Sequence, residues 1–389
     1  MKLKQKPSDF IVEEIPNFNI LSDKDDYKIF LMEKKEIDTF DSIEIISKKL
    51  RIPRSQIGFA GLKDKHGITK QYISLPAKYN TTTLKYKEKI RIEHVGYLNR
   101  KIKIGDLHGN IFTITARDIK QEELQDIYSR ASSIPKIGVP NYFDSQRFRS
   151  VIDKHFIAKY ILQKNYEQAV KIFLTKYIKS EKRTIKEEKR IIQAHWNNLS
   201  TINVRNKILA TIIKRYLNTN NWLEAYKKIP SYLREMFVNA YQSYLWNECI
   251  KEVFRQHIDK KKLYSIRYSI GYLLFYKKLS SSEIQNIPLS FKTISHKIQP
   301  SEFEQKIISK ILSQEGVALD DFDIKKTTGN FFKTRERAII IKPNNLLLSD
   351  PVKDELNYRG RNKRFKITLS FTLPKGSYAT IVTKRVFNQ

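Results

Sequence analysis

Residues 58–71, GFAGLKDKHGITKQ, place several ionisable side chains between glycines, in a stretch with the composition of a turn. Asp64 stands near its centre, with Lys63 and Lys65 on either side. The simplest role for an aspartate in a turn is to accept backbone N–H groups. The same carboxylate is ionised at neutral pH, and neighbouring lysines favour that form. Besides capping a turn, Asp64 could therefore receive a phosphate group, or act as a nucleophile or base.

The phosphate hypotheses lack the residues that they need. DKHGIT departs from the Asp-Lys-Thr-Gly-Thr signature of phosphorylated transport ATPases at His66 and Ile68, and the related phosphatase pattern needs a second Asp where His66 stands. No Gly-Lys-Ser/Thr follows Gly61 or Gly67 at the spacing of a P-loop. The seven histidines show neither HExxH nor paired i, i+4 spacing, so we predict no metal site. A turn residue and a nucleophile remain as alternatives.

A second stretch with possible chemistry is VPNYFDSQRFRS at 139–150. The amide of Asn141 offers both a donor and an acceptor to the edge of a base, and Phe143 offers a flat face. Arginines alternate with these aromatic residues, a pattern that suits an extruded nucleotide. Near the C-terminus, LPKGSYAT at 373–380 presents Tyr378 beside an expected hairpin turn. Taken alone, either stretch is equally typical of loops whose aromatic residues belong to a core.

The overall composition points to a polyanionic partner. The 389 residues include 73 Lys and Arg against 41 Asp and Glu, a net charge of +32. Nucleic acid is the partner that such an excess favours, because each neutralised phosphate releases counterions; a Lys-rich composition bias is the alternative. The charge run YRGRNKRFK at 358–366 is either a solvated face or a phosphate contact.

Cysteine usage and hydropathy indicate a cytoplasmic protein. Cys249 is the single cysteine, so no intrachain disulfide is expected. The first residues, MKLKQKPSDFIVEE, lack the apolar centre of a signal peptide. No apolar run approaches the ~20 residues that span a bilayer, so we expect no membrane partner.

These motifs must be positioned by two kinds of structure. Periodicity predicts strands around 10–14, 69–76, 90–98, 110–119 and 337–343, and helices at 39–50 (capped by Thr39 or Asp41), within 151–175, at 203–217 and, as an amphipathic helix, at 231–254. Residues 179–190 are expected to be a charged link or a solvated helix face, and the segment after 364 is expected to form two β-rich runs around a Pro-Lys-Gly turn. We therefore predict an α+β protein in which 1–150 and 336–389 form one sheet domain, interrupted by a helix-rich insertion at 151–335.

In chain order, five stretches resemble the TruD family of tRNA pseudouridine synthases: LKQKPSDFIVEE, GFAGLKDKHGITKQYISL, VPNYFDSQRFR, NAYQSYLWN and LPKGSYAT. The resemblance implies a pseudouridine synthase fold, with a mixed, mostly antiparallel sheet and a family-specific helical insertion (the TRUD domain). It implies conversion of a specific uridine of tRNA, uridine 13 in bacterial members, to pseudouridine, without a cofactor or metal. We expect a monomer.

The resemblance also assigns roles to single residues. Asp64 falls on the family's catalytic aspartate, which attacks C1′ of the ribose or C6 of the base or assists a glycal route. Phe10, Asn141, Phe143 and Tyr378 fall on positions expected to contact the substrate. Lys4 and Glu14 fall on charged positions flanking the first motif, and Lys63 is expected to keep Asp64 ionised.

Three departures from the family pattern concern loops. Asp144 and Arg149 stand where many members have Gly, and Gly67 stands where Ala is usual. Because Asp tolerates left-handed geometry better than most residues, the first of these turns is expected to survive. A non-catalytic RNA-binding or RNA-folding protein on the same scaffold is the alternative function, and a metal-free phosphotransferase is a more distant one.

Overall fold

The chain folds into two units, a sheet unit and a helical unit. The computed structural model describes residues 1–178, 181–358 and 363–388. The sheet unit consists of Met1–Val139 and Lys342–Asn388, and the helical unit of Pro140–Ile341. The helical unit therefore begins at 140 rather than after 150, and ends at 341 rather than at 335. Part of the charge run at 358–366 lies outside the described residues, as do 179 and 180.

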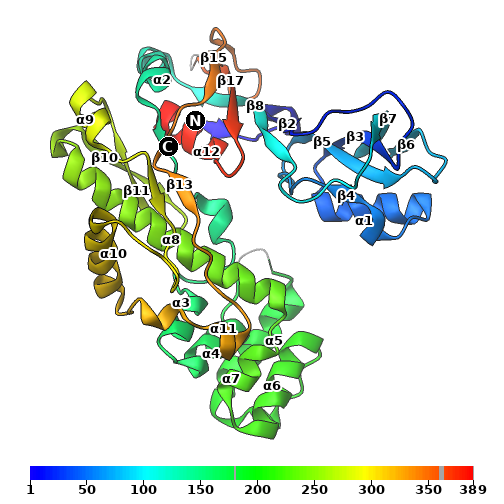
Figure 1. The fold of residues 1–389 in the computed structure, drawn as a ribbon, viewed down its shortest axis with the longest axis vertical. Coiled ribbons are helices and arrows are strands. Elements are labelled where there is room, and N and C mark those ends of the chain that lie inside the picture. Colours follow the sequence, from blue (N-terminus) through cyan, green and yellow to red (C-terminus); the bar gives the residue numbers. More distant parts are fainter. Residues whose placement is uncertain (179–180, 359–362, 389) are drawn as a thin grey trace. The chain divides into compact units, whose positions relative to one another are not determined.

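The sheet unit contains one large mixed sheet. Its strands are β1 (Lys2–Leu3), β2 (Phe10–Pro16), β3 (Tyr27–Lys35), β4 (Gly58–Phe59), β5 (Ile68–Pro76), β6 (Thr83–Tyr86), β7 (Ile90–Leu98), β8 (Leu107–Ile119), β15 (Asn344–Leu348), β16 (Val352–Lys353) and β17 (Phe365–Pro374). The central order is β15-β17-β8-β2-β5-β3-β7-β6. Among the strand pairs of this sheet within the described residues, β2 and β5 form the one parallel pair, with Ile11 opposite Ile68. The expected mixed, mostly antiparallel sheet is confirmed, and β17 from the end of the chain completes it beside β8 (Figure 1).

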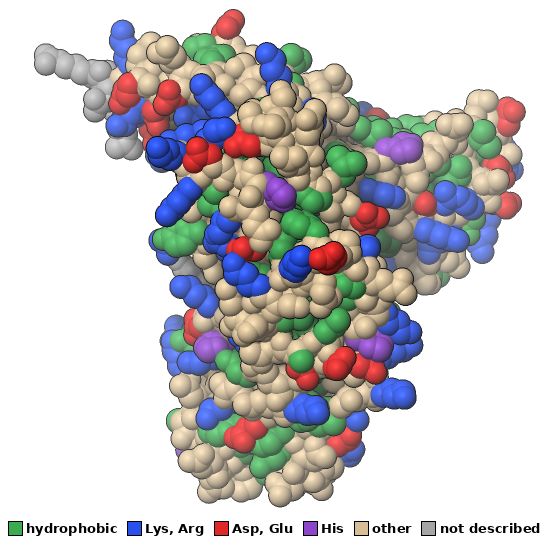
Figure 2. Space-filling view, turned by 60° about the vertical axis from the view of Figure 1, so that its left-hand side comes forward, with side chains coloured by type: hydrophobic (Ala, Val, Ile, Leu, Met, Phe, Trp, Pro, Cys, Tyr) green, Lys and Arg blue, Asp and Glu red, His purple; other side chains and the backbone are tan. Residues whose placement is uncertain are grey.

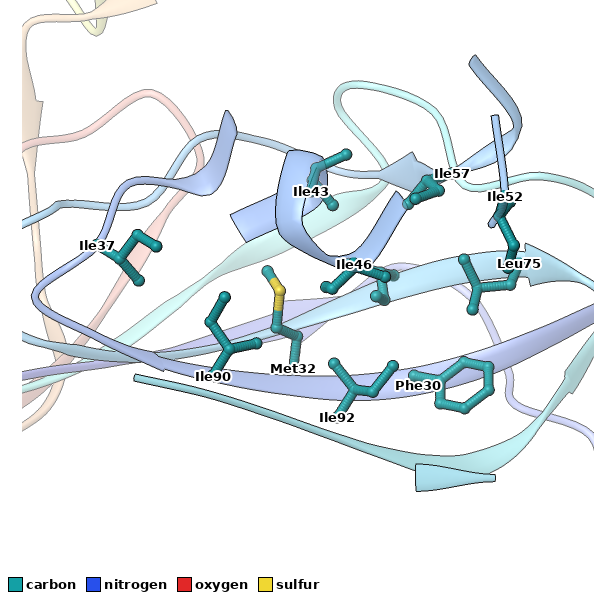
Figure 3. Packing of buried hydrophobic residues seen from close by; sticks show 11 residues of the cluster. Phe30, Met32, Ile37, Ile43, Ile46, Ile52, Ile57, Leu75, Ile90 and Ile92 are labelled. Atoms are coloured by element: carbon teal, nitrogen blue, oxygen red, sulfur yellow. The ribbon is translucent and has the colours of Figure 1, made fainter. Parts of the chain in front are cut away.

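Helix α1 (Thr39–Leu50) covers one part of this sheet with the predicted bounds. Its apolar residues Ile43 and Ile46 are fully buried against Phe30 and Met32 of β3 (Figure 3). The helix is capped by Asp38, whose carboxylate accepts the N–H of Asp41 at 2.9 Å, so the prediction of Thr39 or Asp41 as the cap is wrong. A cap must have extended backbone angles, and Asp38 has them, with φ −79° and ψ 166°.

The end of the chain differs from the prediction of two β-rich runs. The first run is β17, but the second is helix α12 (Ala379–Phe387), which packs on α2 (Leu124–Ile137). Val382 and Val386, one helical turn apart, are fully buried. Burial of this helical face overrides the strand preference of its β-branched residues. The turn before it, which contains Gly376 at φ 85°, joins a strand to a helix rather than two strands.

The helical unit is organised around α8. Its helices are α3 (Ile157–Leu162), α4 (Tyr166–Thr175), α5 (Arg183–Ala194), α6 (Lys207–Thr219), α7 (Trp222–Lys227), α8 (Ser231–His257), α9 (Ser281–Asn286), α10 (Glu302–Glu315) and α11 (Lys325–Thr328). Its strands are β10 (Leu263–Tyr268) paired with β11 (Gly271–Tyr276), and β12 (Ser290–Lys292) paired with β13 (Glu336–Ala338). The chain crosses between the units in β9 (Val139–Pro140) and just after β14 (Ile340–Ile341). The predicted strand at 337–343 is therefore split between β13 and β14.

Helix α8 is less amphipathic than predicted. Between Phe237 and Phe254 its buried residues lie on most sides of the helix, and they include the polar side chains of Gln242 and Asn247. A helix that other elements surround needs no single apolar stripe. Within the described ranges, none of the helices has an apolar stretch long enough to cross a bilayer.

A buried charge network joins the two chain segments of the sheet unit. The guanidinium of Arg117 on β8 donates to both carboxylate oxygens of Asp9, at 2.9 and 3.0 Å, and to Asp354 at 3.0 Å. The side chains of Arg117, Asp9 and Asp354 are 5%, 2% and 0% exposed. Each of the two buried carboxylates therefore depends on Arg117 for its compensating charge.

We expect Arg117→Met to lower the free energy of unfolding by about 3–5 kcal/mol, because it leaves two buried carboxylates without a cation. Urea unfolding monitored by circular dichroism measures the change. Lys120→Met, at the exposed end of the same β-strand region, is the matched control, with an expected change within about 0.5 kcal/mol. Equal stability of the Arg117 variant and the wild type would show that the network contributes no net stability.

Candidate active site

Asp64 lies in the turn between β4 and β5, with its carboxylate engaged on both oxygens. Oδ2 accepts the ammonium of Lys4 at 2.6 Å, and Oδ1 accepts the backbone N–H of His66 at 3.3 Å. The side chain is only 8% exposed. The structure therefore combines two of the roles considered for this residue: it caps its own turn, and a neighbouring cation favours its ionised form.

Lys4 brings Asp64 and Phe10 together. The backbone of Lys4 is left-handed, with φ 57°, which is an uncommon conformation for a residue other than glycine. From there the ammonium reaches Asp64 and also lies 3.8 Å from the centroid of the Phe10 ring. Phe10 is 5% exposed and packs edge-on against Phe112. Three residues that the sequence marked as candidates thus form one group at the start of β2.

Lys63 is paired with Glu14, and Lys4 is a cation in contact with Asp64. The Lys63 ammonium lies 2.5 Å from Glu14 Oε2 and donates to Asn110 Oδ1 at 2.8 Å. Burial raises the pKa of Glu14, and Lys63 opposes that rise. Glu14 also accepts the N–H of Tyr72 at 3.1 Å. This ion pair ties the Asp64 turn to β2, β5 and β8.

Three buried side chains that the sequence analysis did not assign to the site hold the backbone of the Asp64 turn. Lys34 of β3 donates to the carbonyl oxygen of Asp64 at 2.7 Å and to that of Ile37 at 2.8 Å. Thr39 Oγ1 accepts the N–H of Lys63 at 3.0 Å. Gln71 donates to the carbonyl oxygen of Gly61 at 3.1 Å, and accepts the hydroxyl of Thr39. We call Lys34, Thr39 and Gln71 the backbone clamp; each of them is at most 1% exposed.

Burial lowers the pKa of Lys34 to about 8. The carboxylates of Asp64 and Asp38 oppose the shift, and the ammonium of Lys63 adds to it. The Lys34 ammonium, which is the charged member of the backbone clamp, therefore loses its proton only slightly above neutral pH. A signal for Lys34 was present in the sequence, because it shares the inward face of β3 with Phe30 and Met32 at a spacing of two.

Tyr378 belongs to the same unit as Asp64 and stands just before α12, half-buried. Its carbonyl oxygen accepts the N–H of Ile381 at 3.0 Å, which begins the helix. The contacts described above bring together five of the candidate residues: Lys4, Phe10, Glu14, Lys63 and Asp64. Tyr378 lies at the start of α12.

Asn141 and Phe143 belong to the helical unit. The Asn141 amide donates to the carbonyl oxygen of Ala338 at 3.0 Å and accepts from Arg337 at 2.8 Å, and the residue is 5% exposed. Arg337 also covers the Phe143 ring at 4.2 Å from its centroid. These two bonds use one of the two N–H donors and one of the two lone pairs of the amide. Its contact with substrate remains a prediction.

Asn247 of α8 binds the backbone of Phe143 with both ends of its amide. Its amide oxygen accepts the N–H of Phe143 at 2.9 Å, and its amide nitrogen donates to the carbonyl of the same residue at 2.8 Å. Asn247 is fully buried. It ends the stretch NAYQSYLWN and Arg337 precedes the AIIIKP run, so both lay in segments that the sequence analysis had marked without a role for these residues.

We expect Asn247→Ala to lower the free energy of unfolding of the helical unit by about 2–4 kcal/mol, because it leaves a buried N–H and a buried carbonyl unpaired. Denaturant unfolding measures the loss. Asn197→Ala, at an exposed position of the same unit, is the control, with a change within about 0.5 kcal/mol. A wild-type midpoint for the Asn247 variant would contradict the assigned role of this amide.

A solved structure of a putative tRNA pseudouridine synthase D from Methanosarcina mazei has a TM-score of 0.73 and 25% identity, covering 100% of this chain and 93% of that one. By fold, the protein is therefore a pseudouridine synthase. The family described as tRNA pseudouridine synthase D (TruD) matches residues 1–265 and 283–386.

Curated relatives agree with this match over the full length of the chain. A probable tRNA pseudouridine synthase D 2 from Methanocaldococcus jannaschii is 41% identical, covering 100% of this chain and 92% of that protein. The tRNA pseudouridine synthase D of Aquifex aeolicus is 30% identical, covering 100% and 98%. This chain belongs to the TruD family. It is accordingly an enzyme of the isomerase class.

Proposed function

We propose that this enzyme converts uridine 13 of tRNA to pseudouridine, with Asp64 as its nucleophile. The observation that carries the proposal is the state of Asp64 in the sheet unit. Its carboxylate is almost buried, contacts the Lys4 ammonium at 2.6 Å, and stands on a backbone that the clamp residues hold. A buried carboxylate with a compensating cation and a fixed main chain is prepared to act on a bound ligand.

The proposed reaction rearranges the nucleoside without adding atoms to it. The uridine is extruded from the tRNA, at a cost of a few kcal/mol that stacking and base contacts repay. Asp64 attacks C1′ of the ribose or C6 of the base, or assists a glycal route, and the bond from N1 to C1′ breaks. The uracil then turns, a bond from C5 to C1′ forms, and any bond to the Asp64 carboxylate breaks, which frees the carboxylate again. C5 then loses its proton, for which Asp64 is the proposed base, and N1 gains one. Phe10, Asn141, Phe143 and Tyr378 remain proposed RNA contacts.

Charge supports tRNA as the substrate. The chain carries a net charge of +32, and on the face shown in Figure 2 Lys and Arg side chains are spread widely over the surface. Such a surface binds phosphates through counterion release, so affinity for tRNA should fall steeply between low and moderate salt. A flat salt response would count against this part of the proposal.

The test uses a tRNA transcript tritiated at C5 of its uridines. We expect the enzyme to release tritium from one uridine per molecule, with pseudouridine mapped to position 13 after carbodiimide treatment and primer extension. A transcript with cytidine at position 13 is the matched control and should release none. Release from both transcripts would show that the enzyme modifies a uridine other than uridine 13. Tight binding without any release would support the non-catalytic RNA-binding alternative.

A further inference from the structure

The helical unit contains a basic surface hollow that the proposed catalytic group does not use. It has a volume of about 420 Å³, and most of its lining comes from Lys325 of α11 and from residues 331–335. Figure 1 shows the course of this segment between α11 and β13. Phe331, Lys297, Lys325, Lys333 and Arg335 contribute to its lining. We call it the Phe331 hollow. All of its lining residues belong to the helical unit.

An exposed aromatic ring stands in this hollow. Phe331 is 47% exposed, whereas the adjacent Phe332 is 6% exposed and packs edge-on against buried Phe322, with 4.7 Å between ring centroids. Phe331 is thus not needed to fill the core. The ammonium groups of Lys333 and Lys325 lie 5.0 and 5.7 Å from its centroid, within cation–π range.

The segment that carries the ring is held in place by buried hydrogen bonds. The carbonyl oxygen of Lys333 accepts from Gln242 of α8 at 3.0 Å and from Thr293 at 2.9 Å. Thr293 also accepts the N–H of Arg335 at 2.9 Å. Because the backbone is fixed on this side, the exposed side chains of Lys333 and Arg335 are presented to solvent at a spacing of two residues.

The cations of the hollow are available for a ligand. Lys297, Lys325, Lys333 and Arg335 form no ion pair with any residue that the structure describes, and Asp323 is the single acid in the lining. Some lysines elsewhere in the same unit are paired, as Lys262 is with Glu283 at 2.8 Å. Uncompensated cations around an exposed ring are complementary to a flat, anionic ligand.

We infer that the Phe331 hollow binds one unpaired nucleotide of the tRNA, with its base stacked on Phe331 and its phosphate against Lys333 and Arg335. A nucleotide combines the two properties that the hollow matches, a flat face and a negative charge. The inference deepens the proposed function and rests on it for the identity of the RNA. It adds a second nucleotide contact to that of the reacting uridine.

Binding measurements test the hollow separately from catalysis. Phe331→Ala should weaken tRNA affinity about fivefold or more, as expected for the loss of one stacked base, whereas Phe331→Trp should keep it. Lys333→Ala should reduce the slope of log K against log salt by about 1. Tyr272→Ala is the matched control, because Tyr272 is an aromatic of the same unit that is 59% exposed and lies outside the hollow. It should bind tRNA as the wild type does.

Photocrosslinking gives a direct readout that does not depend on truncated side chains. Benzoylphenylalanine in place of Phe331 should crosslink to tRNA, and the same group in place of Tyr272 should not. In turnover, Phe331→Ala should raise KM and leave kcat at saturating tRNA unchanged. Wild-type affinity of both Phe331→Ala and Lys333→Ala, or equal crosslinking at the two positions, would overturn the inference. Failure of the proposed reaction shows itself differently, as bound tRNA without tritium release from the unmodified protein.

Discussion

Asp64→Asn is expected to abolish tritium release from tRNA labelled at uridine C5 while leaving tRNA binding intact. The amide has nearly the shape of the carboxylate and keeps an oxygen for the N–H of His66. It lacks the negative charge that contacts Lys4 at 2.6 Å and that would attack the nucleoside. Loss of a nucleophile costs at least about a thousandfold in rate, so single-turnover kinetics with a long time course is the suitable measurement.

Asp106 offers a matched control for this change in the same unit. Like Asp64 it lies in a turn, accepts a backbone N–H (that of Lys103, at 2.8 Å) and pairs with a cation, Arg100. Asp106→Asn therefore removes the same charge from the same kind of local structure. It should retain wild-type tritium release. Equal activity of the Asp64 and Asp106 variants would remove Asp64 from its assigned role and leave it as a turn residue.

Elements with one buried face were predictable from the sequence. Helix α1 and strands β5 and β7 have their predicted bounds, or differ by one residue, because apolar residues recur on one face of each. The C-terminal helix α12 was missed because its residues favour strands locally, and only packing on α2 decides its conformation. Helix α8 was predicted, but the periodic pattern did not show that its residues are buried on most sides of the helix.

Some residues of the candidate site were also predictable from the sequence, and others were not. Asp64, Lys4 and Phe10 stood in recognisable motifs, and the structure brings these three together. The backbone clamp could not be read off, because its bonds run from side chains to main-chain atoms distant in sequence, as from Lys34 to the carbonyl of Asp64. Such bonds depend on how β3 and β5 are registered, which the sequence does not state. A polar residue on the inward face of a strand, as Lys34 is, was the available sign.

Lys34→Met is expected to lower kcat by about a hundredfold with little change in tRNA affinity. The variant keeps an unbranched side chain of similar length but loses both bonds to carbonyl oxygens, including the 2.7 Å bond to Asp64. A shift of about 1 Å in a catalytic group is enough for an effect of this size. Lys34 is a positioning residue, so the expected signature is a fall in kcat without a rise in KM.

Lys28 provides the control on the same strand. It is also buried in β3, at 9% exposed, and its ammonium also donates to two carbonyl oxygens, those of Tyr79 and Thr81, at 3.1 and 3.4 Å. Lys28→Met thus removes a similar pair of bonds away from the Asp64 turn, and should leave kcat near the wild-type value. Equal losses in the two variants would mean that the Lys34 effect is one of general stability.

The pH dependence separates positioning from stability. The pKa of Lys34 is lowered to about 8, so its ammonium is present below that pH and is lost above it, and kcat should fall as pH rises through about 8. The unfolded chain keeps this proton up to the ordinary lysine pKa of about 10.4. Between these values the unfolded state binds more protons, so the contribution of Lys34 to stability rises with pH. Activity falling while this contribution rises is a pattern that unfolding cannot produce.

Because the uracil N3–H also titrates in alkali, the pH profile of kcat is compared with that of Lys34→Met, in which the limb near pH 8 should be absent. A limb that persists in this variant would assign the titration to another group.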